Sequence, residues 1–189
     1  MFNDDLDRRD FVAIAGGATA AFVGATWPEI RAAGALAASI PQEAPYQFLT
    51  SEQVRELDAI AATLVPTDET PGAREAHVVR FLDNAFATFW KPRQAGLSAA
   101  LKEIAALAAK RPPNERSFAA LSESDRVAVM QEYEKAGSTG GTFRQLRNAV
   151  MTGMFAHPDH GGNFGRTGWK LIGFEDRYSW AAPFGWYDK

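Results

Sequence analysis

Apolar residues recur at helical spacing in five segments, which predict a helical protein. The first begins with the capping box of Thr50 and Gln53 and ends before Pro66. The second is expected to start near Ala73, and the third to cover 94–109. The fourth is expected to run from a cap at 122–125 to 136, and the fifth to cover 142–154. No alternating stretch is long enough to require a sheet. The pattern therefore predicts an all-α fold, a small helical bundle.

The connector at 66–73 is the first of two segments that lack helical periodicity. Its prolines, Pro66 and Pro71, fix φ at about −65°, and Gly72 permits a positive φ. Asp68 can turn its carboxylate onto nearby N–H groups. A rigid link between two helices explains these residues. A partner-binding role for Asp68, Pro71 and Gly72 is the functional alternative.

The C-terminal arm, 157–189, is the second such segment. Its 33 residues include six glycines and eight aromatic residues. Each glycine in a helix costs about 1 kcal/mol relative to alanine, and three tryptophans are unusual in a disordered tail. We therefore expect an irregular but ordered arm that packs its rings on its own bundle, on another protein, or on both. The residues expected to hold the loop or bind a partner are Gly161, Gly162, Asn163, Trp169, Trp180 and Trp186.

The N-terminal segment is predicted to be an export signal. Residues 11–27 form an uncharged run of 17 residues, whereas a membrane span needs roughly 20 apolar residues. Arg8 and Arg9, followed by Phe11 and an apolar residue, resemble the twin-arginine motif, and the acidic start is unusual for a general secretory signal. The twin-arginine translocase, an expected partner, exports folded proteins. An ordinary amphipathic first helix is the alternative.

Ala35-Leu36-Ala37 fits the small-x-small rule for signal cleavage. We therefore expect a signal segment at 1–37 and a single helical domain at 38–189 that includes the arm. This domain carries 17 basic and 18 acidic side chains, so it is nearly neutral. The whole chain has 189 residues, a net charge of −3 and a pI near 5.6. A nucleic-acid partner is not expected from this charge, because such domains have a pI above about 9.

The chain is poor in residues that perform chemistry. It has no cysteine and three histidines, which excludes thiolate metal sites, covalent haem attachment and a cysteine nucleophile. No phosphate-binding loop, strand-borne dinucleotide motif or Gly-x-Ser-x-Gly elbow is present. We therefore expect no catalytic, cofactor-binding or metal-binding residue. His157 and His160, with Asp159 between them, are the remaining candidates for a metal, and a free-standing metal-binding protein or enzyme is the alternative function.

Several motifs together resemble the gluconate 2-dehydrogenase subunit 3 family over about residues 50–174. They are Pro66-Thr67-Asp68, Pro71-Gly72-Ala73, Phe143, Leu146, Gly161-Gly162-Asn163 and Trp169-Lys170-Leu171-Ile172-Gly173-Phe174. One stretch departs from the family pattern: Gly153-Met154-Phe155-Ala156-His157 stands where the family often has a Gly-Tyr-Tyr-like stretch.

The resemblance implies a small subunit of a periplasmic, membrane-associated sugar or sugar-acid dehydrogenase. In such complexes a large flavoprotein of the glucose–methanol–choline type holds FAD and oxidises the substrate, and a third subunit with haem c often takes the electrons. The small subunit carries no cofactor. It helps the flavoprotein to mature and escorts it through the twin-arginine pathway.

Overall fold

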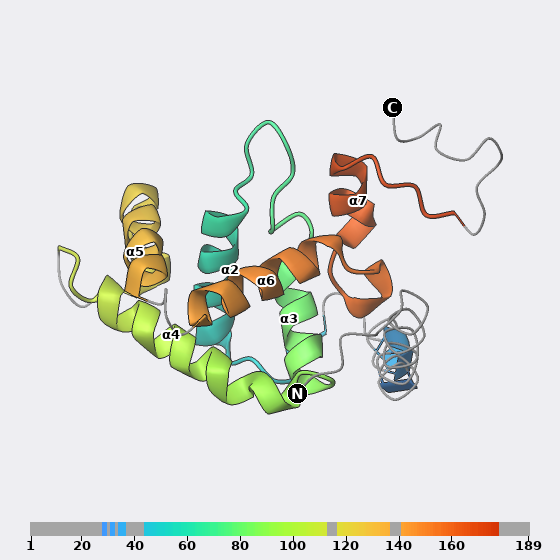
Figure 1. The fold of residues 1–189 in the computed structure, drawn as a ribbon, viewed down its shortest axis with the longest axis horizontal. Coiled ribbons are helices and arrows are strands. Elements are labelled where there is room, and N and C mark those ends of the chain that lie inside the picture. Colours follow the sequence, from blue (N-terminus) through green and yellow to red (C-terminus); the bar gives the residue numbers. More distant parts are fainter. Residues whose placement is uncertain are drawn as a thin grey trace, which may run out of the picture.

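The computed structural model describes residues 28–29, 31–32, 34–36, 44–112, 117–136 and 141–177 (Figure 1). Arg8, Arg9 and Phe11 of the predicted signal, and Trp180 and Trp186 of the arm, lie outside this set. Every regular element in the described part is helical, which confirms the all-α prediction. The α-helices are α2 (Ser51–Leu64), α3 (Val78–Ala87), α4 (Gln94–Ala108), α5 (Glu123–Ala136), α6 (Thr142–Phe155) and α7 (Thr167–Leu171).

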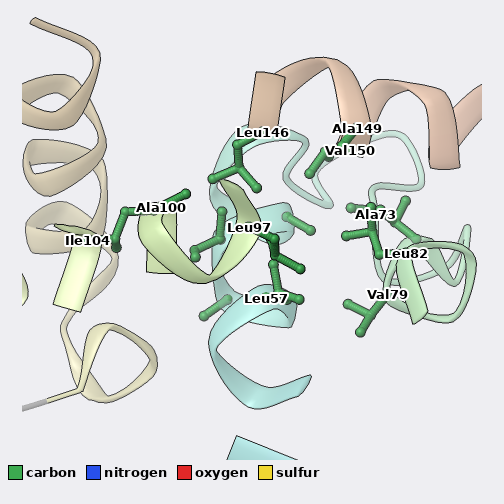
Figure 2. Packing of buried hydrophobic residues seen from close by; sticks show 14 of the residues in the cluster. Leu57, Ala73, Val79, Leu82, Leu97, Ala100, Ile104, Leu146, Ala149 and Val150 are labelled. Carbon is green, nitrogen blue, oxygen red and sulfur yellow. The ribbon is translucent and has the colours of Figure 1, made fainter. Parts of the chain in front are cut away.

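Helix α3 lies at the centre of the bundle. Its residues from Val78 to Phe86 are all buried, and it packs against both α2 and α6. Figure 1 shows α6 crossing α3, while α4 contacts α5 and α6 on the other side of the bundle. Leu57 of α2, Leu82 of α3, Leu97 of α4 and Val150 of α6 point into one shared core (Figure 2).

The predicted helix caps are present. The Thr50 hydroxyl accepts a hydrogen bond from the Gln53 N–H at 3.2 Å, and the Gln53 side chain accepts one from the Thr50 N–H at 3.0 Å. At α5, the Ser122 hydroxyl accepts from the Asp125 N–H at 3.2 Å. These bonds satisfy N–H groups that have no partner inside the helix, so local sequence determines where α2 and α5 begin.

The second helix starts later than its apolar spacing predicts. Helix α3 begins at Val78 instead of near Ala73, because His77 has a left-handed backbone with φ 53°. A single left-handed residue interrupts a right-handed helix. Residues 73–77 form turns, and the Val78 N–H donates to the Ala73 carbonyl at 3.1 Å.

Two charged side chains on α3 hold the segment that leads into α2. The fully buried Asp83 carboxylate accepts three backbone N–H bonds, from Gln47 at 2.8 Å and from Phe48 and Leu49 at 2.9 Å each. Arg80 donates to the Ala44 carbonyl at 2.7 Å. Because a buried polar group without such partners is costly, these contacts align residues 44–49 along α3.

The longest α-helix in the described part is α4, with 15 residues. A membrane crossing takes roughly 20 apolar residues. Within the described residues, no helix has both the length and the apolar character that a crossing requires.

We expect Asp83→Asn to lower the free energy of unfolding by about 3 kcal/mol, because an amide would turn a donor toward backbone N–H groups. The matched control is Asp58→Asn at the exposed Arg74–Asp58 pair, which should cost less than about 1 kcal/mol. Urea unfolding followed by circular dichroism measures both. Equal effects of the two substitutions would contradict the structural role of Asp83.

Candidate functional site

The glycine loop at 161–163 is packed tightly against the crossing of α3 and α6. A Cβ atom on Gly161 would lie 2.5 Å from the Asn84 amide nitrogen, and one on Gly162 would lie 2.3 Å from the Gly153 carbonyl oxygen. Gly161 also has a left-handed φ of 91°. Asn84 donates from its amide to the His160 carbonyl at 3.2 Å. The two glycines are therefore required for close approach of the loop to the bundle.

Asn163 is the polar centre of the loop and is fully buried. Its side-chain oxygen accepts from the backbone N–H of Gly168 at 2.8 Å and of Trp169 at 3.4 Å. Its amide nitrogen donates to the Ala156 carbonyl at 3.0 Å. Asn163 thus joins the end of α6 to the start of α7, because its side chain satisfies backbone groups on both sides of the glycine loop.

Trp169 anchors α7 on the end of α6. The residue is 9% exposed, and its indole nitrogen donates to the Phe155 carbonyl at 2.8 Å. Gly168 lies so close to α6 that an added Cβ would be 2.0 Å from the Met154 carbonyl oxygen. This contact explains a glycine inside a helix, since its propensity cost is offset by packing that no larger residue permits.

The described part of the arm is more regular than expected. Two 3₁₀ turns, Pro158–His160 and Phe164–Arg166, precede α7. Figure 1 shows α7 beside the C-terminal end of α6, at the periphery of the bundle. The arm therefore packs on its own bundle along the described stretch, and its role in binding another protein stays a prediction.

The connector between α2 and α3 is a closed turn. The Asp68 carboxylate accepts from the N–H and the hydroxyl of Thr70 at 2.8 and 2.9 Å, which lowers the pKa of this exposed carboxyl. A Cβ on Gly72 would lie 2.6 Å from the carbonyl oxygens of Val65 and Pro66. Asp68 and Gly72 therefore shape a rigid link, together with Pro71. A partner-binding role for these three residues remains a prediction.

The two candidate metal ligands are held by different packing partners. His157 lies against the Trp169 ring with centroids 5.5 Å apart, and its Nδ1 accepts from the Asp159 N–H at 3.3 Å. His160 lies against Phe89 with centroids 6.1 Å apart. Its pKa is lowered by burial and, to a smaller extent, by the charge of His157. In the part of the chain that the structure describes, no three acidic or histidine side chains form a group that could hold a metal.

His160 also lies against the N-terminal segment. A Cβ on Gly34, which is buried, would be 2.8 Å from the His160 Cε1 atom. Gly34 precedes the predicted cleavage position after Ala37. The end of the predicted signal therefore contacts the same 3₁₀ turn that carries the candidate ligands.

A cleft of about 410 Å³ lies where α6 approaches α4 and the end of α3. Phe86, Trp90 and Leu97 form part of its apolar lining, and Gln145 and Asn148 are among its polar groups. Arg93 is the one titratable group among the described residues that line the cleft.

Sequence reasoning missed the polar face of α3. Arg80, Asp83 and Asn84 follow i, i+3, i+4 spacing, which places them on one side of the helix. The sequence contains this spacing, but the apolar stripe of the same segment predicts only the side of the helix that faces the core. The three residues are buried, and they hold residues 44–49 and the glycine loop in place.

We expect Gly162→Ala to destabilise the domain by about 3 kcal/mol, because its Cβ would collide with a backbone carbonyl that cannot move away. Gly96→Ala in the exposed first turn of α4 is the control. Its Cβ would meet a side-chain atom at 3.9 Å only, and it should gain roughly 0.5–1 kcal/mol. Thermal and urea unfolding of both variants test this. A Gly162→Ala protein as stable as the wild type would contradict the described packing.

We expect His77 to give the domain a pH-dependent stability. Burial and the charge of Arg80 lower its pKa from 6.5, so the unfolded chain binds a proton at a higher pH than the folded one. The free energy of unfolding therefore falls as the pH drops below about 6.5. His77→Asn keeps a residue that tolerates the left-handed backbone and should show a smaller fall. Unfolding at about pH 7.5 and 5.5 tests this, and equal falls would contradict it.

Comparison with known proteins agrees with this arrangement. The family model for gluconate 2-dehydrogenase subunit 3 matches residues 51–176, a range that contains the connector, the glycine loop and all helices from α2 to α7. No curated protein and no solved structure gives a significant match to the chain. The family match covers most of the chain, including each motif on which the resemblance was based. The chain therefore belongs to the gluconate 2-dehydrogenase subunit 3 family.

Proposed function

We propose that this chain is the non-catalytic small subunit of an exported dehydrogenase complex. In this complex a large flavoprotein of the glucose–methanol–choline type holds FAD and oxidises a sugar, a sugar acid or a glycoside. A cytochrome c subunit with haem is a further member that receives the electrons. The family match at 51–176 carries the proposal, because the family is defined by a subunit of a multi-subunit dehydrogenase.

The use that the domain makes of its buried polar groups supports a non-catalytic role. Asp83 and Arg80 hydrogen-bond to backbone groups of residues 44–49, and Asn163 serves the backbone around α7. Catalytic acids and bases are instead directed toward a space where a substrate can bind. In this proposal the flavin and the oxidation of the substrate belong to the partner.

The proposed role of this subunit is to help the flavoprotein mature and to escort it through the twin-arginine translocase. Arg8, Arg9 and Phe11 supply the signal, and the flavoprotein travels as a folded, FAD-loaded partner. After export the complex stays in the periplasm, and this chain is associated with the membrane through the complex. A rigid helical domain suits this role, because a preorganised surface loses less entropy when a partner binds.

Replacement of both Arg8 and Arg9 by lysine should abolish export of the flavoprotein when the two chains are co-expressed. Arg31→Lys, outside the motif, is the matched control and should leave export unchanged. Flavin absorbance and dehydrogenase activity in the periplasmic fraction measure the effect. Normal export of the flavoprotein with the double variant would contradict the escort role.

Purification of the tagged full chain tests the subunit role itself. A co-purifying large protein with bound flavin is the expected result. If the tagged chain is recovered alone from cells that also produce the flavoprotein, the proposed function is wrong.

A further inference from the structure

The exposed apolar side chains are concentrated on the arm. Among the described residues, seven large hydrophobic side chains are exposed, and four of them lie between positions 164 and 174. The remaining three, Leu36, Tyr46 and Val127, are scattered over other segments. We name the four arm residues the arm patch: Phe164, Leu171, Ile172 and Phe174.

Buried contacts hold the backbone beneath the arm patch in place. Trp169 and Asn163 fasten α7 to the end of α6. The Phe174 N–H donates to the Trp169 carbonyl at 2.8 Å, and the two rings have centroids 5.0 Å apart. Phe164 stacks on the His77 ring with centroids 4.2 Å apart. The arm patch is therefore a preorganised surface on an ordered stretch of chain.

Two ion pairs are formed by charged residues of the arm. Arg166 lies 3.4 Å from Asp176, and Arg177 pairs with Glu175. Because both pairs are partly exposed, a partner can cover the apolar side chains without burying an unpaired charge from these two pairs. This arrangement of apolar residues with a polar surround is typical of protein interfaces.

The arm patch supplies part of the area that a protein interface needs. The four side chains, each about half exposed, present on the order of 400 Å² of apolar surface, which is in the size range of the largest and often functional patches on monomers. A stable interface takes about 800 Å² from each partner. The arm patch therefore supplies roughly half of the surface that one partner contributes.

We propose that the arm patch is the surface on which the large flavoprotein subunit docks. This inference rests on the proposed function for the identity of the partner. Within the arm the roles are divided: Trp169 and Asn163 are buried and position the helix, whereas Ile172, at 61% exposure, and Phe174 contact the partner. The chain belongs to a family of dehydrogenase subunits, and this favours a partner subunit over a second copy of the chain as the occupant.

The test co-expresses the full chain with the flavoprotein and compares substitutions on and off the arm patch. Ile172→Asp and Leu171→Asp should each reduce the flavoprotein retained by the tagged chain at least tenfold, with a thermal midpoint close to that of the wild type. Val127→Asp, at an exposed apolar position on α5, is the matched control and should retain the flavoprotein. Trp169→Ala should lower both the thermal midpoint and the yield of complex.

The outcomes separate the surface from the function. Wild-type retention of the flavoprotein by both arm-patch variants would overturn the docking surface and leave the subunit role standing. Conversion of a dimer of this chain into a monomer, with unchanged flavoprotein binding, would likewise overturn it. If the wild-type chain itself retains no flavoprotein, both the function and the surface are wrong. Size-exclusion chromatography with light scattering distinguishes the dimer from the heteromeric complex.

Discussion

The hydrogen bonds to the buried carboxylate of Asp83 are the interaction on which the rest of this domain depends. A carboxyl group in a protein core is costly unless hydrogen bonds replace its lost water, and three consecutive N–H groups at 47–49 do so here. The same three residues lead directly into the capped start of α2. Asp83 therefore determines how α2 lies against α3, and α2 in turn packs on α5 and on the turn at 118–120.

Helix α3 also orients the arm. Asn84, one residue after Asp83, donates to the loop at His160, and the Ala76 carbonyl just before α3 accepts from the Phe164 N–H at 3.1 Å. The polar side of one short helix thus connects the entry into the bundle with the loop that carries α7. The apolar side of the same helix fills the core. This double use explains why nearly all of α3 is inaccessible to solvent.

Much of the bundle could be predicted from the sequence, because apolar periodicity and caps are local signals. The segments predicted at 94–109 and 142–154 agree with α4 and α6 within one residue at each end. The start of α3 could not be placed in this way, since the left-handed backbone of His77 interrupts a continuous apolar spacing. Helix α7 was missed because the glycine penalty assumes open surroundings, whereas Gly168 touches the Met154 carbonyl. Composition alone also could not show that Trp169 is buried and Ile172 exposed, because burial depends on contacts with other segments.

The end of α6 shows how completion of the fold relates to synthesis of the chain. The last carbonyls of a helix lack partners within it. Here the carbonyls of Gly153, Phe155 and Ala156 accept hydrogen bonds from Asn163 and Trp169. Both donors follow α6 in the chain, so they are synthesised after it. The helix end is therefore completed only once the glycine loop and the start of α7 have been synthesised. A chain that stops before Asn163 would contain all of α6 but would leave these three carbonyls without their donors.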